Sequence, residues 1–254
     1  PSKLADKVNN VLNSVEQADM DPDMKVEVAG LVLRSPLIVA SGVLGSSGSL
    51  IQAASTNPGV GAVVTKTVTY EPRTGYENPT VVDLGYGFLN AMGLPNPGFL
   101  NYKVELESIR MSVETPLIVS IGPSDEEEAG EMVGALNSVA DGFEVNLSCP
   151  HVEDLGLEIG SDVLRVRKIV KAVRESTGKP VLVKISPNVT DFVDVARNAV
   201  EAGADAITAI NTVRGMAIDV NAMKPVLANL YGGLLGEALH PVAVRIVYEL
   251  FEKL

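Results

Sequence analysis

The sequence GFEVNLSCPH, residues 142–151, is the stretch around which the rest of this chain is organised. An alternating apolar run enters it from Gly142, and Pro150 ends the run abruptly, as expected for a strand that stops near Cys149. Cys149 is the only cysteine in the 254 residues. In parallel α/β proteins the residues at the carboxyl ends of strands face the ligand, so Cys149 is a candidate acid/base or nucleophile. The alternative is a small buried hydrophobic residue, the usual role of a single cysteine.

Short runs of this kind alternate with helical stretches along the chain. Each run is nearly continuously apolar and rich in Val and Ile, as strands buried on both faces are. Repeated strand–helix units predict the α/β class and a TIM (β/α)8-type barrel, with only about six units evident. The predicted strands are Pro36–Ser41, Gly61–Thr67, Pro116–Ile121, Gly142–Cys149, Val181–Ser186 and Ala206–Asn211. The predicted helices include Glu126–Val139, Val163–Ser176, Phe192–Ala202 and Pro241–Leu254.

The amino-terminal part of the chain does not show the strand–helix pattern. Leu4, Val8 and Val11 recur at helical spacing, so we expect residues 1–23 to form an amphipathic helical extension. Residues 21–35 are expected to form a small hairpin that closes the bottom of the barrel. The predicted domains are therefore the extension, 1–23, and a barrel domain, 24–254.

Composition limits the classes of partner. The chain is 46% apolar and 20% charged with a mean hydropathy of +0.22, which suits a single globular α/β domain. A formal net charge of −12 argues against nucleic acid or an anionic membrane as partner. No apolar run reaches the roughly 18 residues needed to span a bilayer, and no signal sequence opens the chain, so a cytoplasmic location is expected. One cysteine cannot form an internal disulfide or hold an iron–sulfur cluster or zinc by itself, and no metal site is expected.

Polar residues gather at the carboxyl ends of the predicted strands. Lys66 and Lys184 each end an apolar strand, where an isolated lysine is costly to bury without a partner. Both would meet over the mouth of a barrel, together with the amides of Asn146 and Asn211 and the thiol of Cys149. Such a pocket suits a planar, electron-accepting ligand with acyl or imide groups. The alternative is that either lysine extends from its strand end into water.

Two long loops are candidates for function. The first, Tyr70 to Gly98, is rich in glycine and proline and separates the second and third predicted strands. A loop of this length in a compact domain is usually functional, and the alternative is a structural cap over a barrel edge. The second, Val152 to Gly160, follows the cysteine and could act as a lid.

Seven motifs in order resemble one known family, the class 1 dihydroorotate dehydrogenases, which are FMN enzymes of pyrimidine biosynthesis on a (β/α)8 barrel. The chain is most similar to the class 1B branch, in which the catalytic chain pairs with an electron-transferring subunit. The similarity begins near residue 26 and continues to the end. The motifs are ASG at 40–42, VTKT at 64–67, NAMGLPNPG at 90–98, NLSCP at 146–150, VKISPNVTD at 183–191, INTVRGMAID at 210–219, and KPVLAN with YGGLLG between 224 and 236.

The resemblance implies that Cys149 takes the C5 proton of dihydroorotate while hydride passes from C6 to flavin N5. It also implies which residues hold the pyrimidine, with three backbone amides of the 90–98 motif facing the substrate carboxylate and side-chain amides bonding the ring. The implied substrate-binding residues are Lys66, Asn90, Met92, Gly93, Leu94, Asn146, His151, Asn211 and Thr212.

The same resemblance implies the FMN site. Lys184 is expected at the pyrimidine edge of the flavin, where a cation stabilises negative charge on the reduced ring, and the 40–42 motif is expected beside the isoalloxazine. The implied cofactor-binding residues are Ala40, Ser41, Gly42, Lys66, Thr67, Asn146, Lys184, Gly233 and Gly236.

Two departures from the family pattern leave alternatives open. His151 stands where the family usually has asparagine, and the related dihydropyrimidine dehydrogenases, which reduce uracil and thymine, carry histidine there. The chain also stops where a family member is expected to continue for roughly two more strand–helix units. Gly232, Gly233 and Gly236 then represent only part of the expected phosphate-binding turns. The alternatives are a reductase of uracil-type pyrimidines and a non-catalytic barrel fragment that serves as a scaffold for a partner.

The expected partners follow from the resemblance. They are dihydroorotate and orotate as substrate and product, a second copy of the chain in a homodimer, and an FAD/iron–sulfur electron-transfer subunit. Any iron–sulfur cluster must be held by another chain, because this sequence has a single cysteine.

Overall fold

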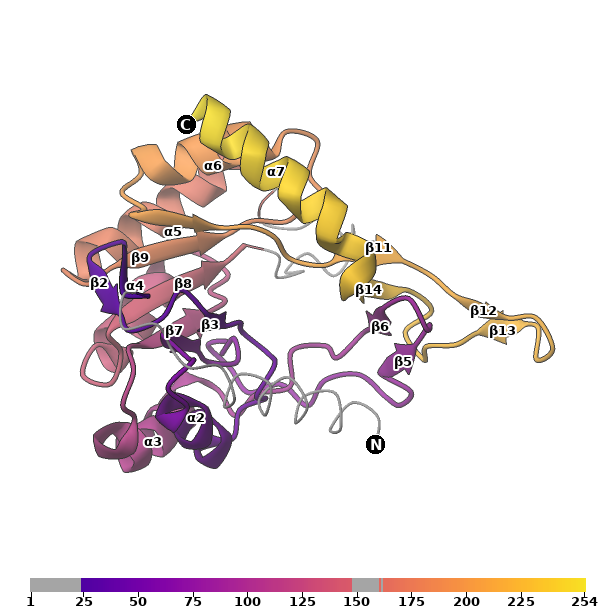
Figure 1. Cartoon of the computed structure of the whole chain (residues 1–254), viewed down its shortest axis with the longest axis horizontal. Helices are drawn as coiled ribbons and strands as arrows, with labels where there is room; N and C mark the ends of the chain where they lie inside the picture. The colour runs from indigo at the N-terminus through magenta and orange to yellow at the C-terminus, as the bar shows by residue number, and fades with distance from the viewer. Residues whose placement is uncertain (1–23, 148–159, 161) are drawn as a thin grey trace.

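In the computed structural model, which describes residues 24–147, 160 and 162–254, a six-stranded parallel sheet forms the centre of the chain (Figure 1). The strand order is β10-β9-β8-β7-β4-β3, so each strand lies beside its successor in this set, as in a TIM barrel. The strands are β3 (Ile38–Val39), β4 (Ala62–Val64), β7 (Leu117–Ile121), β8 (Gly142–Asn146), β9 (Val181–Lys184) and β10 (Ala206–Thr208). Each predicted run contains one of these strands, so the predicted barrel-type sheet is confirmed over these units.

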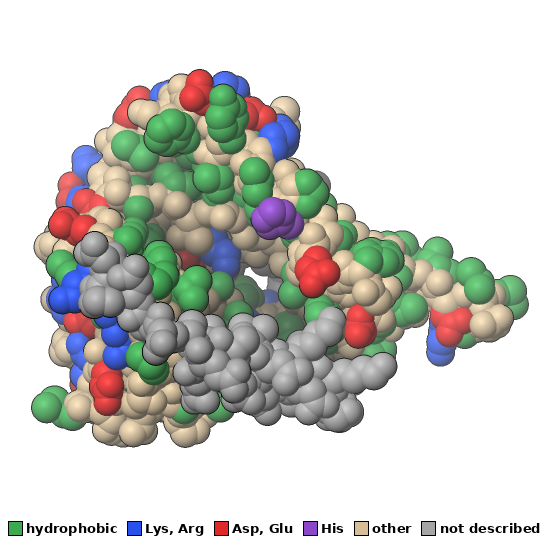
Figure 2. All heavy atoms as spheres, in the orientation of Figure 1, with side chains coloured by type: hydrophobic (Ala, Val, Ile, Leu, Met, Phe, Trp, Pro, Cys, Tyr) green, Lys and Arg blue, Asp and Glu red, His purple; other side chains and the backbone are tan. Residues whose placement is uncertain are grey.

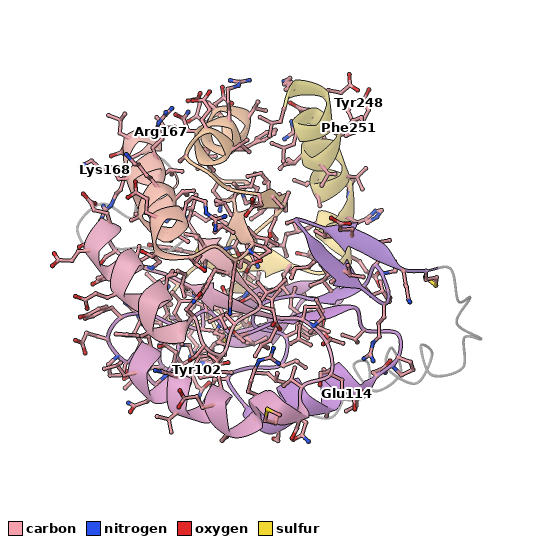
Figure 3. All side chains as sticks on the ribbon, turned by 90° about the vertical axis from the view of Figure 1, so that its left-hand side faces the viewer. Tyr102, Glu114, Arg167, Lys168, Tyr248 and Phe251 are labelled. Atoms are coloured by element: carbon pink, nitrogen blue, oxygen red, sulfur yellow. The ribbon has the colours of Figure 1, made fainter. Side chains whose placement is uncertain are left out.

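Helices cover the outer face of the sheet, as Figures 1 and 3 show. Outward-facing strand residues such as Val119, Phe143 and Val183 are fully buried and share one apolar cluster with Met132 and Ile169 of the helices. The helices are α2 (Gly48–Thr56), α3 (Phe99–Ile109), α4 (Glu126–Leu136), α5 (Val163–Ser176), α6 (Phe192–Glu201) and α7 (His240–Lys253), with short 3-10 turns η1 (Arg110–Ser112) and η3 (Glu237–Leu239). The four predicted helices are confirmed, with ends that differ by at most a few residues.

An antiparallel hairpin closes the amino-terminal end of the sheet. It consists of β1 (Val26–Val28) and β2 (Leu31–Leu33), and Leu33 packs in a buried cluster with Ile118 and Leu182 of the strands. A Cβ added to Gly61 would stand 1.8 Å from the carbonyl oxygen of Ser35, so the chain after the hairpin lies directly against the start of β4. The predicted hairpin at the barrel bottom is confirmed.

A second, antiparallel sheet was not predicted. Its order is β11-β14-β6-β5, and its strands are β5 (Val81–Asp83), β6 (Phe88–Asn90), β11 (Val213–Gly215) and β14 (Gly232–Leu235). The region Tyr70 to Gly98, expected to be a loop, contributes two of these strands, and residues 213–235 contribute the other two. The expectation of a structureless loop is therefore wrong for 81–83 and 88–90, where short strands with no clear alternation are fixed by pairing with a distant segment.

The second sheet continues into a hairpin arm that projects from the molecule (Figure 1). The arm contains β12 (Ile218–Asp219) and β13 (Lys224–Pro225), and its side chains at Val220 and Met223 are exposed. Tyr248 and Phe251 point outward from α7 (Figure 3). No helix in the described part of the chain is both long and apolar enough to cross a membrane.

Candidate active site

Polar side chains on or just after five strands, β3, β4, β7, β8 and β10, meet in one hydrogen-bonded network at the carboxyl edge of the parallel sheet. The Thr67 hydroxyl lies 3.2 Å from the Ser41 hydroxyl and 2.9 Å from the Ser120 hydroxyl. Asn146 donates to Thr67 at 3.3 Å and accepts from the Asn211 side chain at 3.3 Å. Thr67 and Asn146 are buried, at 3% and 7% exposed, so these contacts hold their side chains in fixed positions.

Lys66 borders a pocket beside this network. The pocket has a volume of about 530 Å³, within the range typical of small-molecule sites. It also includes Gly42 and Met92, so it brings together the predicted flavin motif and the predicted substrate loop. A Cβ on Gly42 would be 3.6 Å from Lys66 Nζ, and the φ of +90° at Gly42 favours glycine. In the space-filling view this face is hollowed at its centre, with basic and acidic side chains inside the hollow (Figure 2).

The second sheet delivers Asn90 to the same edge. Asn90, the last residue of β6, pairs with Gly233 of β14 and donates its side-chain amide to the Gly233 carbonyl at 3.3 Å. A Cβ on Gly233 would lie 2.0 Å from the Thr212 hydroxyl oxygen, and one on Gly232 would lie 2.2 Å from the Asn90 carbonyl oxygen. The glycine pair therefore allows Asn90 and Thr212, both predicted to hold the pyrimidine, to approach each other across β14.

The turn after Asn90 has an unusual backbone. Gly93 has a φ of +71° and Leu94 a φ of +53°, and a Cβ on Gly93 would be 2.8 Å from the Tyr76 backbone nitrogen. Leu94 packs against the main core, while Met92 is exposed at the pocket. The turn thus has one anchored side chain, and the backbone of the predicted substrate loop is held in a defined shape.

Two charged groups occupy the barrel interior below the network. Lys184 ends β9 and pairs in register with Asn146 and Thr208. Glu144 lies one inward-facing position before Asn146 on β8 and is 2% exposed. Burial raises the pKa of Glu144, whereas the charge of Lys184 and hydrogen bonds from Thr208 and Ser120 act to lower it.

Sequence reasoning missed Glu144, Ser120 and Thr208. Each of these residues faces inward beside a predicted site residue. For Glu144 the sequence does contain an indication of its position. An acidic residue stood alone in an apolar strand, two positions before a predicted ligand. Asn188 is one of the polar residues at the end of a predicted strand but was given no site role, and it donates to the Thr212 carbonyl at 3.1 Å.

Other predicted residues are placed less directly. Cys149 and His151, together with most of the predicted lid 152–160, lie outside the described residues, as does the extension 1–23. Ala40 is exposed beside Ser41, and Gly236 precedes η3 as its N-cap with a φ of +96°. Gly233 lies with the predicted substrate residues rather than at a helix start.

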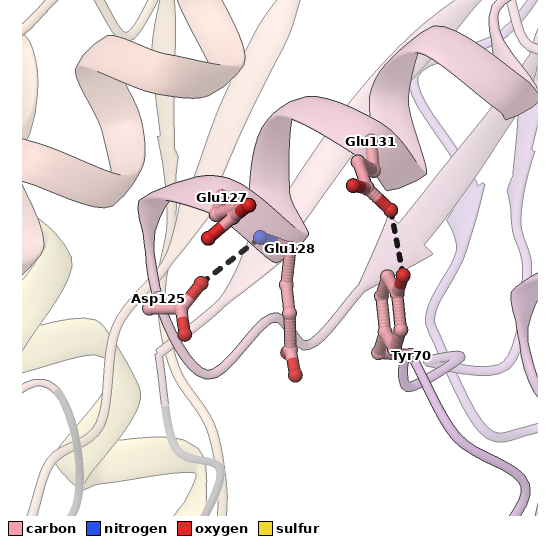
Figure 4. A pocket seen from close by; sticks show the side chains of 5 residues that line it. All are labelled: Tyr70, Asp125, Glu127, Glu128 and Glu131. Atoms are coloured by element: carbon pink, nitrogen blue, oxygen red, sulfur yellow. Dashed lines mark hydrogen bonds between the residues drawn. The ribbon is translucent and has the colours of Figure 1, made fainter.

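A separate acidic recess lies at the start of α4 (Figure 4). Its volume is about 220 Å³, and it contains Tyr70, Asp125 and three glutamates. Asp125 caps the helix by accepting from the Glu128 backbone at 2.9 Å, and Glu131 accepts from the Tyr70 hydroxyl at 2.6 Å. The hydrogen bond to Glu131, together with its charge, raises the pKa of Tyr70. This recess contains no residue predicted for the substrate or cofactor, and its carboxylates are explained by helix capping.

The described site residues fit a flavin and a small planar acid. Small residues at 40–42 leave open surface next to Lys66, and the interior supplies a second cation at Lys184, amides at Asn146 and Asn211, and hydroxyls at Ser41 and Thr67. Cations and amide donors around an open surface are the groups that tune and orient a flavin ring. The fold and site together define an α/β-barrel oxidoreductase whose chemistry takes place at the carboxyl edge of the sheet.

Comparison with known proteins identifies the family. Residues 23–254 match the family described as dihydroorotate dehydrogenase. A Pyrococcus furiosus protein is 45% identical over 231 residues, covering 91% of this chain and 76% of that protein. A Methanocaldococcus jannaschii protein is 41% identical over 232 residues (90% and 76%), and a Methanosarcina mazei protein is 46% identical over 228 residues (89% and 73%). All three are named dihydroorotate dehydrogenase B (NAD(+)), catalytic subunit.

The chain belongs to the dihydroorotate dehydrogenase family. This confirms the resemblance found in the motifs and the enzyme class predicted from it, an oxidoreductase that acts on dihydroorotate in pyrimidine biosynthesis. The relatives' names also bear out the similarity to the branch with a separate catalytic subunit.

Proposed function

We propose that this chain is the catalytic subunit of an FMN-dependent dihydroorotate dehydrogenase that converts dihydroorotate to orotate. The observation that carries the proposal is the meeting of Lys66, Asn90, Asn146 and Thr212 at one edge of the barrel, contributed by segments far apart in sequence. The match to the family over residues 23–254 supports both the substrate and the domain boundary near residue 24.

The proposed FMN site uses residues 40–42, Lys66, Thr67, Asn146 and Lys184. When bound, FMN supplies the hydride acceptor for the C6 hydrogen of the substrate. The residues of this chain orient the two rings: Lys66 binds the substrate carboxylate, and Lys184 provides positive charge at the flavin edge. Gly233 of β14 and Gly236, which precedes η3, are the other proposed cofactor residues.

Cys149 is the proposed base for the C5 proton. A thiol has an ordinary pKa of about 8.5, so the site must favour the thiolate for it to accept a proton at neutral pH. Asn146, three residues earlier, is fixed by Thr67 and Asn211. The fixed end of β8 supports the delivery of the following residues, including His151 as a substrate donor, to the same site.

A partner subunit is the proposed destination of the electrons. The relatives are named catalytic subunits, which supports a complex with a separate chain. The resemblance to the class 1B branch implies that the partner carries FAD and an iron–sulfur cluster. Any such cluster must be held by the partner, because this sequence has one cysteine. We also propose that two copies of the catalytic chain form a homodimer at the core of the complex.

The test is an anaerobic titration of the purified protein, followed by its visible absorbance. Bound flavin whose absorbance bleaches on addition of dihydroorotate is the expected result. Bleaching with dihydrouracil but not with dihydroorotate would assign the uracil-type substrate. A colourless protein that does not take up added FMN would overturn the proposal.

Lys66→Ala sharpens this test, because Lys66 is proposed to contact both ligands. We expect weaker binding of FMN and of orotate, measured by fluorescence of the released flavin and by orotate-induced difference spectra. The matched control is Lys103→Ala, which removes a half-buried lysine paired with Glu107 on α3. Normal affinities for both ligands in Lys66→Ala would contradict the proposed contacts.

A further inference from the structure

Glu144 is a buried carboxyl group for which the proposed reaction has no role. It is 2% exposed in the barrel interior, where an unpaired carboxylate is costly. The flanking strands face it with Ser120 of β7 and Lys184 of β9, and Thr208 of β10 reaches it from beyond β9. Among the described residues, Lys184 is the charged group that acts on Glu144.

A chain of hydroxyl groups connects Glu144 to the proposed cofactor surface. Ser120 donates to the Glu144 carboxylate at 3.4 Å, and the Ser120 hydroxyl is 2.9 Å from that of Thr67. The Thr67 hydroxyl is in turn 3.2 Å from that of Ser41, next to Gly42 and the pocket. The contacts therefore run without a break from the interior carboxyl to a residue of the 40–42 motif.

The chemistry of these groups fixes the direction of the chain. A hydroxyl donates one hydrogen bond, and an ionised carboxylate only accepts. If Ser120 donates to Glu144, then Thr67 donates to Ser120, and Ser41 donates to Thr67. Ser41 then presents only acceptor lone pairs to the pocket. A protonated Glu144 can donate to Ser120, which reverses the chain and leaves the Ser41 hydroxyl free to donate outward.

Asn146 reinforces this choice. It donates to Thr67, which fills one acceptor position of that hydroxyl and leaves one donor and one acceptor for Ser41 and Ser120. If Thr67 donates to Ser120 it must therefore accept from Ser41, and if it accepts from Ser120 it must donate to Ser41. In a buried site such a network has two ordered arrangements, one for each donor direction. A mixed arrangement would leave a buried hydroxyl group without a hydrogen bond, which is costly in free energy.

We propose that Glu144 is a positioning residue of the flavin site, which balances the charge of Lys184 and sets, through Ser120 and Thr67, the direction of the Ser41 hydrogen bond. The proposal rests on the proposed function for the identity of the cofactor. Each hydroxyl group keeps its own proton and only rotates, and the one proton gained or lost is that of the Glu144 carboxyl group, which exchanges with water. Glu144 touches neither substrate nor cofactor and acts through its neighbours.

The first experiment follows the Glu144 carboxyl stretch by infrared spectroscopy in the protein freed of flavin. The band that disappears in Glu144→Gln identifies the residue. In Lys184→Gln we expect the protonated band to persist to higher pH than in the wild type, because the cation that favours the carboxylate is gone. An unchanged titration would show that the two groups are not coupled and would overturn the charge-balance role.

The second experiment measures the midpoint potential of the bound flavin. Above the raised pKa of Glu144, Glu144→Gln removes a negative charge near Lys184, so reduction should become easier by about tenfold in the equilibrium constant, or roughly 30 mV for a two-electron couple. Glu131→Gln is the matched control, since it removes the same charge from the outer recess. Equal potentials in wild type and Glu144→Gln, or equal shifts in both variants, would overturn the proposal.

The third experiment tests the hydroxyl chain. Ser120→Ala interrupts it while leaving Glu144 and Lys184 in place, and we expect FMN affinity to lose the pH dependence that Glu144→Gln also removes. Ser108→Ala, an exposed serine on α3, is the control and should retain it. Retained pH dependence in Ser120→Ala would exclude the relay to Ser41. If no FMN binds to any variant, the proposed function fails, while the infrared titration still decides the coupling of Glu144 to Lys184.

Discussion

The two sheets of this protein differ in how they are built and in what they contribute to the site. The parallel sheet pairs strands that follow one another in the chain, and it holds the polar network of Thr67, Asn146 and Glu144. The antiparallel sheet joins β6 to β14, and the Asn90–Gly233 contact spans 143 positions. The first sheet holds most of the proposed flavin residues, whereas the second brings in Asn90, which is proposed to bind the pyrimidine.

This difference predicts that variants in the two sheets can affect the reaction rate and the binding of substrate separately. A change at the parallel sheet should affect the rate, the binding of both ligands or the stability of the whole domain. A change at the antiparallel sheet should affect binding while the barrel stays folded. The variants below, ordered from the largest expected effect to the smallest, test that separation.

Cys149→Ser should give the largest effect, because it removes the proposed base. Loss of a positioned base typically lowers a rate by about 10²–10⁴-fold, and serine is a far weaker base than a thiolate. The rate of flavin reduction by dihydroorotate at neutral pH, measured by stopped flow, should fall in this range. Orotate affinity should stay near the wild-type value; undiminished reduction would remove Cys149 from its proposed role.

Gly61→Ala should destabilise the whole barrel. The new methyl group would meet the Ser35 carbonyl oxygen at 1.8 Å, so the hairpin that closes the sheet must move, at a cost of about 3 kcal/mol. Urea unfolding measures the loss. Gly134→Ala on α4 is the control, because its Cβ meets nothing within 4 Å and should stabilise the helix by about 0.5–1 kcal/mol. Equal free energies of unfolding for the two variants would show that the β1–β2 hairpin can move away from residue 61 at little cost.

Gly232→Ala should act on the antiparallel sheet alone. Its methyl group would lie 2.2 Å from the Asn90 carbonyl oxygen and push that residue from the site. We expect orotate affinity to fall by about tenfold, equivalent to about 1.4 kcal/mol, with a smaller loss of global stability than in Gly61→Ala. Orotate binding and urea unfolding are the two measurements.

Gly215→Ala is the matched control in the same sheet, since its Cβ would be 3.4 Å from its nearest neighbour, Leu89. It should leave orotate affinity close to that of the wild type. If both variants lose affinity equally, or if Gly232→Ala unfolds the barrel, the two sheets are not separable.

Glu144→Gln should give the smallest effect on stability, and one that depends on pH. Burial raises the pKa of Glu144, so the folded protein holds this proton to higher pH than the unfolded chain. The contribution to stability is complete below the ordinary carboxyl pKa and is lost as pH rises through the raised value. Glutamine does not titrate, so the stability of the variant relative to wild type should increase with pH across this window. Urea unfolding at several pH values measures it, and a constant difference would show that Glu144 does not hold a raised pKa.

Much of the parallel sheet could be predicted from the sequence because its signal is local. Strands buried on both faces must be apolar throughout, and runs such as Val181–Ser186 show this without reference to any partner. Residues 81–83 and 88–90 lack such a signal, since each is short and half exposed. These residues become strands because they pair with other segments of the antiparallel sheet. The partner β14 contains two glycines, which are needed because a Cβ there would clash with Asn90 or Thr212.

The sequence by itself determined the barrel-type sheet, the helices around it, the family and the identity of the proposed site residues. It did so because hydrophobic periodicity and motifs are properties of neighbouring residues. Only the tertiary structure decided that Asn90 meets Gly233, that Thr67 joins Ser41 to Ser120, and that Glu144 shares the interior with Lys184. These are contacts between residues distant in the chain, and they exist only once the packing of the sheets has set which side chains face one another.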